Sequence, residues 1–447
     1  MNRMEQPLSK APRIEVVDAL RGFAVMAIIL VHNLEHFIFP VYPTDSPAWL
    51  NILDQGVLNT VFSLFAGKAY AIFALLFGFT FYIQCNNQKK QGKDFGYRFL
   101  WRLVLLAGFA TLNAAFFPAG DVLLLFVVVG VVLFLFRNLS DKMILVLAIL
   151  FLLQPIEWYH YIMSLINPAH QLPDLGVGAM YAEVAEYTKT GTLGQFFWGN
   201  VTLGQKASFL WAVGAGRFLQ TAGLFLLGFY IGRKQLFVTN EKNIRFWITA
   251  LIIGAVAFAP LYQLKELIMK SDALVQQTVG TAFDMWQKLA FTFVLIASFI
   301  LLYQKKGFSK GVSSLRYYGK MSLTNYITQS ILGAIVYFPF GLYLAPYCGY
   351  TLSLLIGFVL FLLQVKFSKW WLSKHKQGPL EHIWHKWTWI GSSRANKFSI
   401  IYFLFIEFQS VRYAKYLYNR LFNVISFCLS LNRSMSEIRS STFCLSL

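Results

Sequence analysis

The feature that most constrains this chain is a series of long apolar segments joined by short connectors. A helix needs about 20 mostly apolar residues to cross a bilayer, and ten segments are close to that length. They lie near residues 15–38, 58–84, 98–117, 119–137, 142–163, 208–233, 244–263, 287–304, 320–343 and 347–371. The sequence therefore predicts an all-α fold, a polytopic membrane helix bundle with about ten transmembrane helices.

Composition agrees with this class. The chain is 57% hydrophobic and only 13% charged, whereas soluble domains carry roughly 25% charged residues. The formal net charge of +19 comes from Lys and Arg in the connectors, which indicates membrane topology and not a nucleic-acid partner. The four cysteines, Cys85, Cys348, Cys428 and Cys444, show no CxxC spacing, so no zinc site or disulfide framework is predicted.

The cations alternate between connectors, and this alternation predicts orientation. The connectors after the second, fourth, sixth and eighth predicted helices are basic, as are the flanks of the bundle, while residues 40–57 and 341–350 hold no Lys or Arg. The basic residues are Lys10, Arg13, Lys89, Lys90, Lys93, Arg98, Arg137, Lys142, Arg233, Lys234, Lys242, Arg245, Lys305, Lys306, Lys310, Arg316, Lys320, Lys366, Lys369, Lys374 and Lys376. Because cytoplasmic connectors are the basic ones, both termini are predicted to be cytoplasmic, an N-in/C-in arrangement.

Residues 1–391 are predicted to form a single transmembrane domain. Its longest connector, about 164–207, is assigned to the outside and is expected to fold as a lid or an interfacial helix. Residues 392–447 form an atypical C-terminal tail whose apolar runs are too short to span. This tail is expected to be peripheral or disordered, and the sequence leaves an oligomer possible.

Polar side chains form one stripe along the first predicted helix. Arg21 and His32 are eleven positions apart, which places them about 20° apart around the axis and about 16 Å apart along it. Asp18 and His36 lie within about 60° of Arg21. Ionisable groups inside a membrane span are costly, so the stripe must face protein or water and is a candidate site.

Simpler roles exist for each member of the stripe. Asp18 and Arg21 have the (i, i+3) spacing of a structural ion pair. His32 and His36 can be hydrogen-bonded packing residues, or an (i, i+4) metal pair. No third ligand is evident, so no metal is predicted.

Several motifs resemble those of the YeiB-like bacterial membrane proteins, which carry a domain of unknown function numbered 418. The opening residues, RIEVVDALRGFAVMAIILVHN, carry the resemblance first. Further matches are Gly67-Lys68-Ala69-Tyr70, Leu76-Phe77-Gly78, Gly120-Asp121-Val122-Leu123, Arg217 with LFLLG at 224–228, Gly319-Lys320-Met321-Ser322-Leu323-Thr324-Asn325-Tyr326 with Gln329-Ser330, and Gly378-Pro379-Leu380-Glu381. The resemblance covers about residues 13 to 390.

More distantly, the chain resembles the wider transmembrane acyltransferase superfamily. Many O-acetyltransferases of that superfamily share an Arg, ten residues and then a His, a spacing that Arg21 and His32 reproduce. YeiB-like chains often carry Asn in place of this histidine, so His32 favours an acyltransferase here. The resemblance implies a multi-pass protein of the bacterial plasma (inner) membrane. It also implies acyl transfer from acyl-CoA (acetyl-CoA) to a hydroxyl or amine of an extracytoplasmic glycan or lipid acceptor.

The resemblance implies roles that the residues can fill chemically. His32 would act as a general base or as the acyl carrier, and Arg21 would hold the anionic donor by charge-assisted hydrogen bonds. Lys68 would stabilise the oxyanion, or extend its ammonium to the interface. Asp121 would orient His32 or His36, or cap its own helix.

The remaining candidates complete a predicted substrate-binding set. Arg217 needs a partner, for which Asp121 and Glu157 are the candidates. Ser322, Asn325 and Gln329 share one helix face, where interhelical hydrogen bonding is the simpler role. The predicted substrate-binding residues are Asp18, Arg21, His36, Tyr70, Arg217, Asn325 and Gln329.

A transporter or lipid flippase is the alternative from another class, because the same stripe would then line a pathway. Against it, the sequence shows no internal repeat and no evident pair of Pro- or Gly-interrupted helices. A scaffold with a sealed polar core is a third interpretation. Signatures of soluble enzymes, such as a Walker loop, HExxH or GxSxG, are absent from the sequence. The predicted partners are therefore the bilayer and a membrane-associated acceptor.

Overall fold

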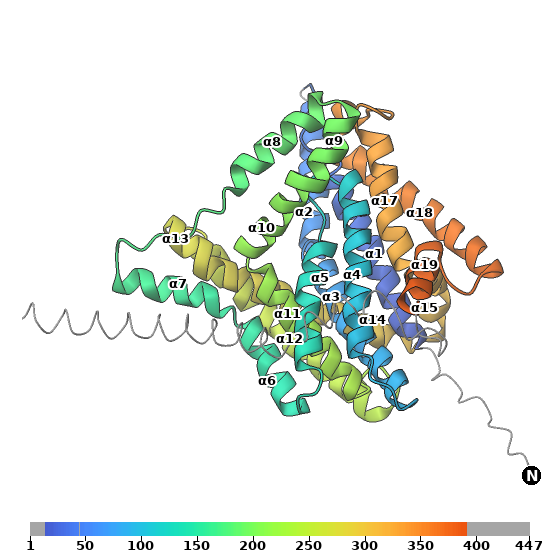
Figure 1. Ribbon diagram of the computed structural model, residues 1–447. Coiled ribbons are helices and arrows are strands. Elements are labelled where there is room, and N and C mark those ends of the chain that lie inside the picture. The colour runs from blue at the N-terminus through green and yellow to red at the C-terminus, as the bar shows by residue number, and fades with distance from the viewer. Residues whose placement is uncertain (1–13, 44, 391–447) are drawn as a thin grey trace, which may run out of the picture. The chain divides into compact units, whose positions relative to one another are not determined.

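The computed structural model describes residues 14–43 and 45–390, and within them every regular element is helical (Figure 1). The predicted C-terminal tail, with Cys428 and Cys444, lies outside the described residues. The helices are α1 (Glu15–Glu35), α2 (Ala48–Phe65), α3 (Lys68–Lys89), α4 (Gly96–Phe116), α5 (Leu123–Phe136), α6 (Asp141–Leu152), α7 (Pro155–Ile166), α8 (Val177–Thr190), α9 (Leu193–Gly199), η1 (Asn200–Gly204), α10 (Gln205–Gly214), α11 (Arg217–Arg233), α12 (Glu241–Ile268), α13 (Ala273–Val275), η2 (Gln276–Gly280), α14 (Thr281–Tyr303), α15 (Lys306–Gly311), α16 (Ser313–Lys320), α17 (Ser322–Tyr337), η3 (Ala345–Tyr347), α18 (Tyr350–Lys374) and α19 (Pro379–Thr388).

The helical content confirms the all-α class, and the long apolar helices identify a membrane protein. Within the described ranges, five helical segments are long and apolar enough to cross a membrane, or up to seven if each of two bent pairs is one span. The five are Ala48–Lys89, Gly96–Phe116, Glu241–Ile268, Ala273–Tyr303 and Tyr350–Lys374. The bent pairs are Asp141–Leu152 with Pro155–Ile166, and Leu193–Gly214 with Arg217–Arg233.

Three helices that were predicted to be continuous are interrupted. The predicted helix 58–84 breaks at Gly67, whose φ is +75°, and the predicted helix 208–233 breaks at Gly216, with φ +66° and a bend of 77°. The predicted helix 142–163 bends by 48° where Gln154, in the left-handed region, precedes Pro155. Glycine tolerates positive φ, and proline cannot donate to the preceding turn. The expectation that Gly- or Pro-interrupted helices are missing was therefore wrong.

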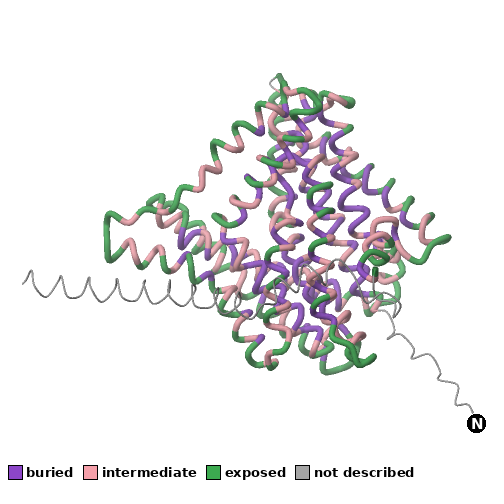
Figure 2. Tube along the Cα trace, viewed as in Figure 1, coloured by how far each residue is buried: buried purple, intermediate pink, exposed green. Residues whose placement is uncertain are grey.

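The stripe-bearing helix α1 lies in the interior of the bundle. It packs against α3, α16, α17 and α18, and most of its residues are buried (Figure 2). The approach to α16 is close enough that a Cβ on Gly22 would overlap the Leu315 carbonyl, and one on Gly319 would overlap the Asp18 carbonyl. The polar stripe is therefore held against protein, as the cost of placing it in lipid requires.

A second close crossing joins α3 and α11. A Cβ on Gly78 would overlap the Phe225 carbonyl oxygen, and one on Gly228 would overlap the Leu75 carbonyl oxygen. Gly78 and Gly228 therefore permit close contact between α3 and α11. The two helices run parallel, because Tyr70 contacts Thr221 near their starts and Tyr82 lies against Gly232 near their ends.

Two of the sequence motifs meet at the start of α17. The Glu381 carboxylate of α19 accepts hydrogen bonds from the backbone N–H groups of Leu323 at 2.7 Å and Thr324 at 3.0 Å, and from the Thr324 hydroxyl at 2.6 Å. Burial raises the pKa of Glu381, against the lowering effect of these hydrogen bonds. The side chain thus caps a helix about 57 residues away in sequence.

We expect Glu381→Ala to lower the free energy of unfolding by about 1–3 kcal/mol, because it leaves buried N–H groups of α17 without an acceptor. Glu381→Gln keeps a carbonyl oxygen and should cost less. Thermal unfolding of the detergent-solubilised protein measures both. Equal losses in the two variants would contradict the capping role.

Candidate functional site

Two cavities lie along the polar stripe of α1. The first, the His32 cavity, has a volume of about 580 Å³ and is lined by both stripe histidines, His32 and His36. The second, the Arg21 cavity, has a volume of about 280 Å³ and is lined by Arg21. The stripe predicted from spacing therefore opens into two separate chambers.

His32 is surrounded by aromatic rings. Its imidazole lies 4.5 Å from the Phe117 ring, 5.6 Å from His36 and 6.1 Å from Tyr326, measured between centroids. Its Nδ1 is buried and has no hydrogen-bond partner among the residues that the structure describes. His36 Nε2 lies 3.8 Å from the Glu35 carboxylate. His32 therefore borders the cavity without a bonded carboxylate in the described part of the chain.

Asp121 does not orient either histidine, so that predicted role is wrong. Its carboxylate accepts from Asn113 Nδ2 at 2.9 Å and from the backbone N–H groups of Leu123 and Leu124 at 3.2 and 3.1 Å. These bonds satisfy the first turn of α5, which is the capping alternative. Asp121 is buried and does not line the His32 cavity.

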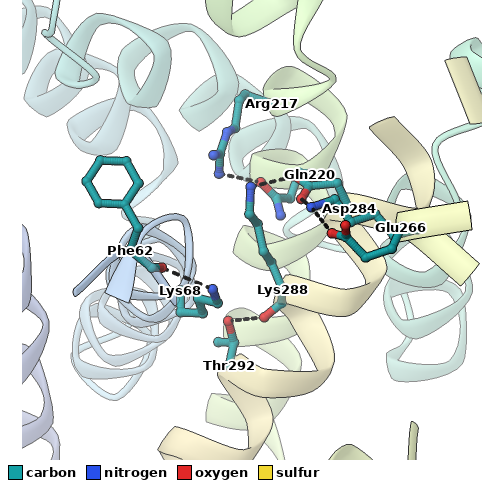
Figure 3. Close-up of polar contacts among 9 residues, drawn as sticks. Phe62, Lys68, Arg217, Gln220, Glu266, Asp284, Lys288 and Thr292 are labelled. Atoms are coloured by element: carbon teal, nitrogen blue, oxygen red, sulfur yellow. Dashed lines mark hydrogen bonds and ion pairs between the residues drawn. The ribbon is translucent and has the colours of Figure 1, made fainter. Parts of the chain in front are cut away.

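Lys68 also does not line the His32 cavity. Its ammonium is buried, donates to the Phe62 carbonyl at 3.4 Å and lies 5.7 Å from the Phe291 ring centroid. Lys288 of α14 lines the cavity instead. Figure 3 shows Lys68 and Lys288 side by side, with Asp284 beside Lys288. Lys288 is not among the residues predicted from the sequence, although a lysine inside a predicted span is itself a signal.

Arg217 and Tyr70 form part of the wall of the His32 cavity. Arg217 donates to Gln220 Oε1 at 3.0 Å, and its guanidinium lies 5.1 Å from the Tyr70 ring centroid. The Tyr70 hydroxyl is hydrogen-bonded to Thr221. The structure shows no ion pair between Arg217 and either predicted partner, Asp121 or Glu157, among the described residues.

Helix α8, from the long connector, covers part of the same cavity. Tyr181 lines it and donates to the Ala119 carbonyl at 3.0 Å. Burial raises the pKa of Tyr181 to about 12, so the hydroxyl keeps its proton and remains a donor near neutral pH. The connector thus supplies cavity wall.

The Arg21 cavity is rich in basic side chains. Arg21 donates to the Thr80 hydroxyl at 2.9 Å and lies 3.4 Å from Asp18, the predicted ion pair. The Arg102 guanidinium lies 3.8 Å from the Trp384 ring centroid. The basic lining residues are Arg21, Arg102, Lys320, Lys376 and His385, beside one carboxylate, that of Glu381.

Tyr326 borders both cavities. Its side chain is 2% exposed, and its hydroxyl has no hydrogen-bond partner in the described residues. The ring stacks on Phe73 at 6.5 Å and lies 6.1 Å from His32. In the sequence, Tyr326 is only part of a motif, because a tyrosine in an apolar helix carries no signal of its own.

Asn325 and Gln329 lie outside both cavities. Asn325 Nδ2 donates to the Tyr318 carbonyl at 2.9 Å and to Ser368 at 3.1 Å, so it joins helices as the simpler alternative supposed. Gln329 is fully buried, and its amide has no partner in the described residues. Because neither residue lines a cavity, the structure does not support the predicted role of Asn325 and Gln329 in substrate binding. The described residues also contain no group of three His, Cys, Asp or Glu that could hold a metal.

This chain is similar to known proteins along most of its length. Residues 231–391 match the family model described as "Protein of unknown function (DUF418)". The uncharacterised protein YxaH of Bacillus subtilis is 25% identical over 407 residues, which cover 86% of this chain and 96% of that protein. The uncharacterised protein YeiB of Escherichia coli is 25% identical over 406 residues, covering 83% and 95%. No solved structure matches.

Proposed function

We propose that this membrane protein, a YeiB-like member of the DUF418 family, is an acyltransferase. It moves an acetyl or other acyl group from acyl-CoA to a hydroxyl or amine of an extracytoplasmic glycan or lipid. One observation carries the proposal: a basic cavity and a histidine-lined cavity lie at opposite ends of one polar stripe and share a single residue, Tyr326.

The Arg21 cavity suits the donor. Coenzyme A carries several phosphate charges, and five basic side chains line this cavity beside one carboxylate that already caps α17. Charge-assisted hydrogen bonds from arginine are the usual means of holding phosphates. Arg21 and His32 are about 16 Å apart along α1, a separation that an extended pantetheine arm can cross.

The His32 cavity suits the acceptor. A hydroxyl is a poor nucleophile at neutral pH, and a neutral imidazole can take its proton. The acceptor oxygen then bonds to the thioester carbonyl carbon, the carbon–sulfur bond breaks, and the thiolate leaves with the proton returned from the imidazole. The Tyr326 hydroxyl, buried and unpaired between the cavities, would donate to the oxyanion. This assigns to Tyr326 the role predicted for Lys68.

We place the protein in the bacterial plasma (inner) membrane with ten spans, N-in and C-in. In the described part of the chain, seven segments are long and apolar enough to span when each bent pair counts as one. Adding α1, α5 and α17, which are apolar but shorter or more charged, gives ten. The basic connectors then share the cytoplasmic face with the Arg21 cavity.

Sealed vesicles of each orientation test both the activity and the sidedness. Labelled acetyl-CoA added outside inside-out vesicles should label a lipid or glycan fraction, while right-side-out vesicles should not be labelled. Arg21→Lys should raise the KM for acyl-CoA about tenfold, because lysine loses the forked hydrogen bonds. The control Arg245→Lys changes an exposed arginine outside both cavities.

Two results would contradict this proposed function. An unchanged KM in Arg21→Lys would remove Arg21 from donor binding. Gradient-driven uptake of a solute with no label transfer would favour the transporter or flippase alternative, for which the interrupted helices at Gly67 and Gly216 are suitable elements.

A further inference from the structure

A cluster of four cations lies behind and along one wall of the His32 cavity. Lys68 of α3 interacts electrostatically with Arg217 of α11, Lys265 of α12 and Lys288 of α14. Figure 3 shows Lys68, Arg217 and Lys288 together. Two of them, Arg217 and Lys288, line the cavity itself. Helices far apart in the sequence therefore bring positive charge to one place within the bundle.

The carboxylates near this cluster neutralise only part of it. Asp284 pairs with Lys288 at 2.5 Å and with Lys265 at 3.8 Å, and Glu266 pairs with Lys265 at 3.3 Å. Neither Lys68 nor Arg217 has a carboxylate within ion-pair distance among the described residues. Lys68 is only 3% exposed. Buried charge without a counter-charge is costly, so the wall favours an anion.

The backbone at the start of α3 adds to this preference for an anion. A Cβ placed on Gly67 would lie 2.9 Å from Lys288 Cδ and 3.4 Å from Arg217 Nη2, so the start of α3 lies against both side chains. Within residues 14–43 and 45–390, no side chain caps this 22-residue helix. Its first N–H groups and the positive end of its dipole therefore face the same region, where Gly67 and Ala69 line the cavity.

The rest of the cavity is apolar. Ile28, Val31, Phe62, Phe65 and Trp211 line it between the cationic wall and the histidines. A volume of about 580 Å³ is within the range of sites for drug-sized ligands, roughly 300–1,000 Å³. A ligand that fills it would combine an anionic group with an apolar part.

We infer that the His32 cavity binds a lipid phosphate, with the phosphate on Arg217, Lys288 and the N-terminus of α3, and with the apolar part against the phenylalanine-lined wall. If the proposed function holds, this phosphate-bearing amphiphile is the acyl acceptor, and its hydroxyl is presented to His32. Phosphate fits better than a carboxylate, because its three oxygens can accept from a guanidinium, an ammonium and backbone N–H groups together.

Binding to the purified full-length protein tests the inference without requiring activity. The probe is dihexanoyl phosphatidate, measured by calorimetry beside dihexanoylglycerol, which lacks the phosphate, and glycerol 1-phosphate, which lacks the chains. We expect phosphatidate to bind at least tenfold more tightly than either. Rising salt should weaken its binding, because the contact is ionic.

Variants locate the contact. Arg217→Gln and Lys288→Gln should each weaken phosphatidate binding about tenfold, and Lys288→Arg, which keeps the charge beside Asp284, should restore it. Lys265→Gln is the matched control, because it removes one charge from the same cluster at a residue outside the cavity lining.

Each outcome decides a separate point. Equal affinity for dihexanoylglycerol, or equal weakening by Lys265→Gln, would overturn the phosphate site. Equal affinity for glycerol 1-phosphate would overturn the lipid as its source and leave a soluble phosphate ester. Phosphatidate binding that depends on Arg217, in a protein that transfers no label, would uphold the site and overturn the acyltransferase.

Discussion

Replacing His32 by alanine is expected to lower the rate of acyl transfer by about 10²–10⁴-fold, the usual contribution of a positioned general base. Donor binding should be unchanged, because the donor phosphates are assigned to the Arg21 cavity and not to the His32 cavity. Label transfer from acetyl-CoA in inside-out vesicles measures the rate. The KM for acyl-CoA, taken from the residual activity, measures the donor.

The matched control for this variant is His160→Ala. His160 is likewise a helical histidine, in α7, but it is bonded to His170 at 3.0 Å and lines neither cavity. It should leave the rate of transfer within a factor of two or so, as for a substitution distant from any site. A His32 variant that transfers label as fast as the wild type would remove this residue from the chemistry.

Replacing Gly228 by alanine is expected to lower the free energy of unfolding by about 3 kcal/mol, at the upper end of overpacking effects. The added Cβ would overlap the Leu75 carbonyl oxygen, which belongs to backbone and cannot turn aside. Helices α3 and α11 would have to separate. Because Gly67 precedes the first residue of α3 and Arg217 begins α11, phosphatidate binding should weaken as well.

Gly108→Ala is the control, because Gly108 also lies within a helix, α4, and a Cβ there would meet nothing within 4 Å. Alanine has the higher helix propensity by roughly 1 kcal/mol, so this variant should be neutral or slightly stabilised. Denaturant unfolding in a fixed detergent compares the two. Similar stability of both variants would show that the α3–α11 crossing is not tight in solution.

Some of the site could be predicted from the sequence because it depends on one helix alone. The spacing of Asp18, Arg21, His32 and His36 follows from helical periodicity, and the cost of charge in lipid requires their shared face to be sheltered. The structure places that face inside the bundle, with Arg21 and the histidines lining cavities. These properties follow from local geometry and solvent.

Other predictions failed because they depended on neighbouring helices. Asp121 was a candidate partner of the histidines, yet it bonds to Asn113 and to the first turn of its own helix. Lys68 and Lys288 are both lysines within apolar segments, and only packing decides that Lys288 reaches the cavity. Side-chain type and spacing within one segment do not contain this information.

The sequence by itself determined the membrane class, the all-helical fold and the polar stripe of α1, since each follows from apolar length or from the 3.6-residue period of a single helix. Only the tertiary structure decided where helices break, which cations line a cavity and that Tyr326 borders both cavities. Those features depend on crossings between distant segments, such as Gly78 with Phe225 and Glu381 with Thr324. Such crossings are set by lateral packing, which a pattern along one helix does not specify.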